Sequence, residues 1–233
     1  MSTDKHPRPA RGLFSHMSES RPPPDALLLL APGCPHCPKV LTGLADLVKS
    51  GQIGRLHVIN LANHPEEAQS RGVRSVPWTR IGDFHFSGLL SPKELADWSG
   101  LAGTSEGWRK YIGHLIETQQ LSELETRLAK DTDLLAIMLP MLADKDTSLP
   151  MRLGLDAVLE TIPPEKLAGH FDLLRTLIEN PEPHIRIDGI HYLNSSGHPQ
   201  AQTLIEARLM DEHKAVRDAA KSTLDDQDDP RNG

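Results

Sequence analysis

The chain has 233 residues, of which 38% are hydrophobic and 24% charged, so it can bury one large core or two small ones. A formal net charge of −7 argues against a general nucleic-acid binder, and no apolar run approaches the length of a membrane span. The charge is uneven, because residues 1–103 hold 11 basic and 9 acidic residues whereas residues 104–233 hold 14 and 23. This change indicates two domains that meet near residue 103.

Residues 1–24 are rich in Pro, Ser and charge, so we expect a disordered tail there and a second short tail at 230–233. The apolar run that follows, at 26–31, is too short for the core of a secretory signal. A lipoprotein signal ending at Cys34 is a poor alternative, because its cleavage site would have an unsuitable proline just upstream. We therefore expect a cytoplasmic protein, with neither membrane nor nucleic acid among its partners.

Hydrophobic patterns and turn residues predict a small α/β domain over residues 25–103. We expect four strands, at 26–31, 55–61, 78–82 and 84–88, and three helices, at 35–50, 64–71 and 91–99. The last two strands surround Gly82-Asp83 and form a candidate hairpin. Ser91 and Glu94 form a capping-box pattern at the start of the last helix.

Cys34 and Cys37 are the two cysteines of the chain, and they occur as Cys34-Pro35-His36-Cys37 at the start of the first predicted helix. The free N–H groups and the dipole of a helix N-terminus favour a thiolate, which is the species that attacks a disulfide. We therefore predict thiol–disulfide exchange, with Cys34 as the exposed nucleophile and Cys37 as the shielded resolving thiol. Pro35 and His36 belong to the predicted catalytic set, since a protonated His36 would stabilise the thiolate; an exposed loop histidine is the alternative.

Two further charges lie near the predicted site without a clear role. Lys39, in the first turn of the helix, and Arg74 could add positive potential, but surface side chains of this kind are usually only solvated. Zinc bound by the two cysteines and His36 is an alternative that the spacing makes awkward. We expect no metal and no cofactor other than a redox-active Cys34–Cys37 disulfide.

Residues 104–229 lack strand signals and show the pattern of helices. A nine-residue pattern, an apolar residue followed by Arg and, seven positions after the Arg, by Leu, occurs three times, at Arg152, Arg186 and Arg217. A further helix is expected before each copy, at 133–143, 165–179 and 199–210, and an atypical first pair at 107–118 and 122–130, with a Ser122–Glu125 capping box. We expect these arginines to pair with acids of a neighbouring repeat, for which Asp156 and Asp188 are candidates, rather than to form an anion-binding ladder.

Residues 25–100 resemble the thioredoxin superfamily, through the apolar strand that enters the Cys-Pro-His-Cys motif and through Val76-Pro77. The resemblance implies that Pro77 is a cis proline facing the disulfide and that Val76 and Pro77 contact an extended substrate. Trp78, at a position where the family commonly has Thr, could line the substrate groove. Aromatic residues next to a strand are more often core. The chain departs from the family at Gly33, where Trp is common, and in having no acidic residue in the first strand.

Residues from about 104 to 229 resemble HEAT repeats, which implies an α-solenoid that binds proteins and has no chemistry of its own. The sequence thus predicts an α/β thioredoxin-like domain followed by an all-α HEAT-like repeat domain. The predicted function is disulfide exchange on a protein substrate, with a protein partner on the repeats. The alternatives are a helical-repeat scaffold whose dithiol serves as a redox sensor or is vestigial, and a metal or persulfide carrier.

Overall fold

The computed structural model describes residues 21–227, so both predicted tails lie largely outside the described residues. The chain divides into two compact units, one ending at Ser99 and the other comprising Gly82–Phe84 and the residues from Gly100 onward. Within the described part, no helix is long and apolar enough to cross a bilayer.

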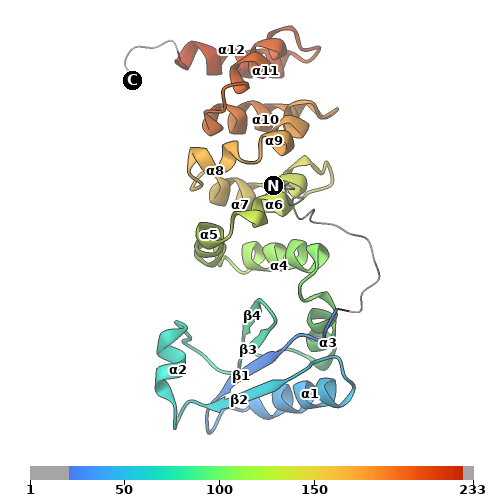
Figure 1. The fold of residues 1–233 in the computed structure, drawn as a ribbon, viewed down its shortest axis with the longest axis vertical. Helices are drawn as coiled ribbons and strands as arrows, with labels where there is room; N and C mark the ends of the chain where they lie inside the picture. Colours follow the sequence, from blue (N-terminus) through green and yellow to red (C-terminus); the bar gives the residue numbers. More distant parts are fainter. Residues whose placement is uncertain (1–20, 228–233) are drawn as a thin grey trace, which may run out of the picture. The chain divides into compact units, whose positions relative to one another are not determined.

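The first unit is a four-stranded mixed sheet with helices on both faces (Figure 1). Its strands run in the order β2-β1-β3-β4, with β1 parallel to β2 and antiparallel to β3. The bounds are β1 Ala26–Leu30, α1 Cys37–Lys49, β2 Leu56–Asn60, α2 Pro65–Ser70, β3 Trp78–Ile81, β4 Phe84–Ser87 and α3 Pro92–Leu101. The expected α/β elements are therefore present in the expected order.

The position of β1 follows from its composition. Five apolar residues in a row suit a strand covered on both faces, and β1 lies between β2 and β3. Leu28 faces the opposite side of the sheet from Leu27 and Leu29, which pack with Trp78. The strand therefore anchors the loop that follows Leu30 and carries the two cysteines.

The second unit is all helical, as predicted (Figure 1). Its α-helices are α4 Ser105–Glu117, α5 Leu121–Lys130, α6 Leu135–Ala143, α7 Leu149–Leu159, α8 Pro164–Ala168, α9 Phe171–Ile178, α10 Pro183–Ser196, α11 Ala201–Ala207 and α12 Lys214–Gln227, with short 3₁₀ turns at Thr132–Leu134 and Arg208–Met210. α4 packs on α5, α6 and α7, and α10 contacts α8, α9, α11 and α12. Gly189 permits the close approach of α10 to α9, because a Cβ there would overlap the backbone nitrogen of Ile178.

Three sequence predictions for this unit are wrong in detail. The helix expected at 165–179 is two helices, α8 and α9, separated at Gly169 and His170. The helix expected at 199–210 ends as a 3₁₀ turn after Ala207. Ser122 does not cap α5, because the helix begins at Leu121 after Gln120 and has no side-chain hydrogen bond at its cap.

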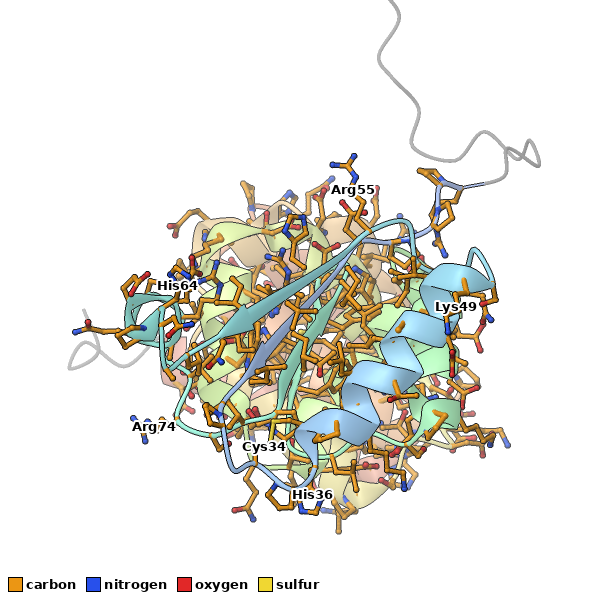
Figure 2. The ribbon with its side chains drawn as sticks, turned by 90° about the horizontal axis from the view of Figure 1, so that it is seen from below. Cys34, His36, Lys49, Arg55, His64 and Arg74 are labelled. Atoms are coloured by element: carbon orange, nitrogen blue, oxygen red, sulfur yellow. A yellow bond between two sulfur atoms is a disulfide. The ribbon has the colours of Figure 1, made fainter. Side chains whose placement is uncertain are left out.

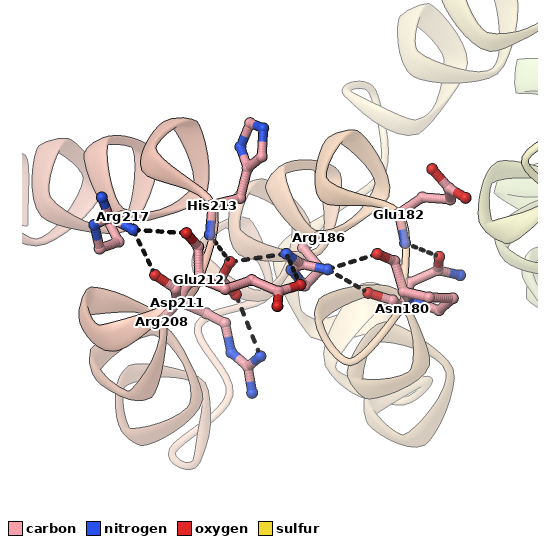
Figure 3. Close-up of polar contacts among 9 residues, drawn as sticks. Asn180, Glu182, Arg186, Arg208, Asp211, Glu212, His213 and Arg217 are labelled. Carbon is pink, nitrogen blue, oxygen red and sulfur yellow. Dashed lines mark hydrogen bonds and ion pairs between the residues drawn. The ribbon is translucent and has the colours of Figure 1, made fainter.

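Two of the three arginines of the predicted repeat, Arg152 and Arg186, pair with an acid of a neighbouring segment, whereas Arg217 donates to backbone carbonyls of the loop just before its own helix. Arg152 on α7 pairs with Asp188 on α10, and it also donates to the carbonyl of Leu142 at 2.8 Å. Arg186 on α10 donates to Asp211 at 2.8 Å, and Arg217 donates to the carbonyl of Asp211 at 2.7 Å (Figure 3). The other candidate acid has a different partner, since Asp156 accepts a 2.6 Å hydrogen bond from the hydroxyl of Tyr192. The pairing of Arg152 and Arg186 is an observation, and the HEAT assignment itself stays a prediction.

Candidate redox site

The two cysteines form a disulfide at the start of α1, with their Cα atoms 5.5 Å apart. Cys34 lies in the loop after β1 and is partly exposed, whereas Cys37 is the first residue of the helix and is 3% exposed. The two sulfurs therefore differ in accessibility, in the sense predicted from their order in the motif.

The polar environment of the partly exposed sulfur comes from the helix terminus. The backbone N–H of Cys37 donates to Sγ of Cys34 at 3.2 Å, and this N–H is one of the groups that a helix leaves without an intrahelical acceptor. The first turn of α1 contains no acidic residue. A negative charge on this sulfur, after reduction, would meet a hydrogen-bond donor and the positive end of the helix dipole.

A second segment of the chain faces the disulfide. The carbonyl oxygen of Val76 lies 3.7 Å from Sγ of Cys34, and the peptide bond between Val76 and Pro77 is cis. The ring of Pro77 is buried, while Val76 is partly exposed. The structure thus brings Val76 next to the Cys34–Cys37 pair, although Val76 is 42 residues from Cys34 in the sequence.

The remaining predicted site residues lie around this centre. Pro35 and His36 are exposed on the loop that carries the motif. Figure 2 shows Cys34, His36 and Arg74 at the same end of the sheet. The indole of Trp78 is 6% exposed and packs on Leu27, Leu29 and His85, so its role in a substrate groove stays a prediction.

One neighbour of the site was not predicted from the sequence. The N–H of Gly88 donates to the carbonyl of Pro77 at 2.8 Å, which holds the loop after β4 beside the cis proline. The next residue, Leu89, is 42% exposed. In the sequence, Leu89 is part of an apolar pair that directly follows a strand and a glycine. Such a pair is usually assigned to the core.

Comparison with known families agrees with this geometry. Residues 26–99 match the model of the thioredoxin domain. No curated protein matches the chain. The first unit is accordingly a thioredoxin-like domain that carries a disulfide between two cysteines three residues apart.

Proposed function

We propose that the protein is a thiol–disulfide oxidoreductase that acts on protein disulfides or dithiols through Cys34 and Cys37. The observation that carries the proposal is the asymmetry of the pair: one sulfur is reachable and receives an amide hydrogen bond, and the other is buried. This is the arrangement that exchange through a mixed disulfide requires.

The chemistry follows from the two positions. In the reduced protein, the Cys34 thiolate attacks one sulfur of a substrate disulfide; a new S–S bond forms, and the other substrate sulfur leaves as a thiolate. The Cys37 thiolate then attacks Sγ of Cys34, which restores the protein disulfide and releases the second substrate thiolate. Two electrons pass to the substrate, and the protons from the two protein thiols end on the two substrate thiols. A dithiol substrate runs the same steps in reverse.

The residues around the pair have proposed supporting roles. Val76 offers backbone groups beside Cys34 to which an extended substrate segment can add as a strand. Pro77 shapes that edge, and Trp78 supports it from the core. Pro35 and His36 form the exposed surface of the motif, where His36 can place positive charge near the sulfur when protonated.

Two substitutions test this function. Cys34→Ser should abolish the reduction of insulin disulfides, because the attacking sulfur is gone. Cys37→Ser should accumulate mixed disulfides with the substrate, because the resolving sulfur is gone. Full insulin reduction by either variant would refute the assignment.

We further propose that the helical unit recruits a protein partner, which is the source of the disulfide substrate. The supporting feature is an apolar groove of about 570 Å³ formed by α4, α5 and α7, whose lining includes Ile116, Leu121 and Leu153. Leu149 and Leu153 on α7 are 68% and 60% exposed, and clustered exposed leucines are typical of interaction sites.

A double variant tests recruitment separately from chemistry. Leu153→Glu in the Cys37→Ser background should lower the yield of protein trapped as a mixed disulfide in cells, because a charge then lines the groove. The same change should leave the rate with short peptide disulfides unaltered. An unchanged yield of trapped protein would remove this groove from the proposal.

The helical groove also supports a second candidate function that is not enzymatic. In it, the helical unit binds a partner and the dithiol only senses the redox state. Sluggish exchange with every disulfide, together with partner binding that changes on reduction, would favour that function. Action in the cytoplasm remains part of our proposal, and cell fractionation tests it.

A further inference from the structure

The segments that meet at the disulfide share an unusual charge pattern. They are residues 26–45, 68–82 and 84–93, and none of them contains an Asp or a Glu. The first two are joined by the approach of Cys34 to Val76, and the last two by the hydrogen bond from Gly88 to Pro77. The chain as a whole carries a net charge of −7, and none of its acidic residues lies in these three segments.

Three basic side chains in these segments are exposed and lack partners within residues 21–227. Those of His36, Lys39 and Arg74 make no hydrogen bond or ion pair with any described residue. Other cations of the same unit do have acidic partners: Lys49 pairs with Asp46 at 3.1 Å and Arg55 with Asp25 at 3.9 Å, and within the second segment Arg71 pairs with Glu67. The positive charge near Cys34 is therefore not neutralised within the described part of the unit.

These cations belong to the two segments that meet at the reachable sulfur. Lys39 lies in the first turn of α1, two residues after Cys37, and Arg74 precedes Val76 by two residues. Figure 2 shows Arg74 and His36 at the same end of the sheet as Cys34, whereas Arg55 lies at the opposite end. A substrate segment that runs along Val76 past Cys34 would pass between positive side chains, next to the exposed Leu89.

We propose that the site selects cysteines flanked by acidic residues, with Arg74 and Lys39 as the specificity-determining side chains. This inference rests on the proposed function and names its substrate class. The substrate is an extended peptide disulfide with Asp or Glu near the reacting sulfur. The electron balance is that of the exchange above, in which the peptide disulfide is the oxidant and the protein dithiol the reductant.

The physical argument concerns charge during the reaction. Attack by the Cys34 thiolate brings a negative sulfur toward an acidic segment, and this repulsion would slow the encounter without nearby cations. Unpaired Lys and Arg side chains near Cys34 make the local electrostatic potential positive and increase the rate of encounter with an acidic peptide. Added salt weakens this effect. Each exposed pair contributes little, so two or three cations should together give an acidic peptide an advantage of about 3- to 10-fold.

The test uses the full chain, reduced with dithiothreitol and freed of the reductant. Three peptide disulfides of equal length carry Glu, Gln or Lys on both sides of the cysteine. The second-order rate constant for release of peptide thiol is measured at low and high salt. At low salt we expect the rate constant to be highest for the Glu peptide, lower for the Gln peptide and lowest for the Lys peptide. At high salt the three rate constants should differ less. The ratio of the Glu to the Gln rate is the readout, because a change in thiolate reactivity cancels from it.

Arg74→Gln and Lys39→Gln should each lower this ratio by about twofold or more. Arg55→Gln is the matched control, since it removes one exposed positive charge at the far end of the sheet and should leave the ratio unchanged. Equal rates for the three peptides, or an equal effect of Arg55→Gln, would overturn this inference and leave the oxidoreductase function intact. Failure to react with every peptide and with insulin would overturn both.

Discussion

The amide nitrogen of Cys37 lies 3.2 Å from Sγ of Cys34, so the buried member of the pair supplies a hydrogen bond to the reachable one through its backbone. The two cysteines are thus coupled by geometry as well as by their covalent bond. The contact uses the N–H of the first helical residue, so it survives replacement of the Cys37 side chain.

This relationship predicts unequal reactivity of the two thiols after reduction. Cys34 should be alkylated by iodoacetamide at least about tenfold faster than Cys37 near neutral pH, because it is exposed and its thiolate is hydrogen bonded. Mass spectrometry of briefly treated protein locates the label. The Cys34→Ser variant gives the intrinsic rate of Cys37, and equal labelling of both cysteines in the wild type would contradict the geometry.

The second prediction concerns Asp211, which lies in the arginine network of Figure 3. Its side chain is 4% exposed and accepts hydrogen bonds from Arg186 at 2.8 Å and from the amide of His213 at 2.9 Å. Burial acts to raise the pKa of the Asp211 carboxyl, but the hydrogen bonds from Arg186 and His213 prevail and the pKa lies below its ordinary value. Asp211→Asn should lower the free energy of unfolding at neutral pH by about 3 kcal/mol, because the buried Arg186 then keeps only the exposed Glu212, 3.6 Å away, as a counter-charge.

The sign of the pH dependence follows from the lowered pKa. The contribution of Asp211 is fully present above the pKa of about 3.9 that an unfolded aspartate has, and it is lost as the pH falls through the lower folded value. Urea unfolding followed by circular dichroism should therefore show a large difference between wild type and Asp211→Asn at pH near 7 that shrinks in acid. Asp218→Asn removes an exposed partner of Lys214 and should change the unfolding curve little. Equal effects of the two substitutions would contradict the burial argument.

Gly189 gives the third prediction. A Cβ at this position would overlap the backbone of Ile178, which cannot move as a flexible side-chain end could. Gly189→Ala should therefore separate α9 from α10 and lower the free energy of unfolding by about 1–3 kcal/mol. Gly100→Ala is the control, because no heavy atom lies within 4 Å of the place a Cβ would take there and alanine favours the helix; stability should rise by about 0.5–1 kcal/mol. An equal loss of stability in both variants would contradict the explanation that the Gly189 variant is destabilised by overlap with Ile178.

The first unit could be predicted closely because its signals are local. Each strand is a short apolar or alternating run between turn residues, and the observed ends differ from the expected ones by about a residue. The capping box is confirmed by two hydrogen bonds, from the Ser91 amide to the Glu94 carboxylate at 2.7 Å and from the Glu94 amide to the Ser91 hydroxyl at 3.2 Å.

The helical unit was less predictable where tertiary packing decides. The apolar pattern runs continuously over residues 165–179, yet the chain breaks near Gly169, which a helix tolerates only at a cost. The Ser122–Glu125 spacing fits a capping box, but α5 starts one residue too early for Ser122 to be its cap. The same local pattern was right at Ser91, so spacing alone did not distinguish the two cases.

At the site, too, features set by neighbouring residues could be predicted, and contacts between separate segments could not. The Cys-Pro-His-Cys motif placed one sulfur at the helix entrance, and Val76-Pro77 came from a family resemblance. Leu89 escaped prediction because its position depends on the hydrogen bond from Gly88 to Pro77 across the loop. Such a contact between residues distant in sequence has no periodic signal.

The last prediction tests a buried polar group in the sheet beneath the site. Thr79, paired with Leu28 in the register of β1 and β3, is 0% exposed, and its hydroxyl has no hydrogen-bond partner among the described residues. Burying an unsatisfied hydroxyl costs about 1–3 kcal/mol. Thr79→Val replaces the hydroxyl by a methyl group of similar size, so the free energy of unfolding should rise by about 1 kcal/mol in urea titrations. Thr79→Ser keeps the hydroxyl and loses a methyl group, so it should be less stable than the wild type. A Thr79→Val protein less stable than the wild type would show that the hydroxyl has a partner in solution, such as a buried water.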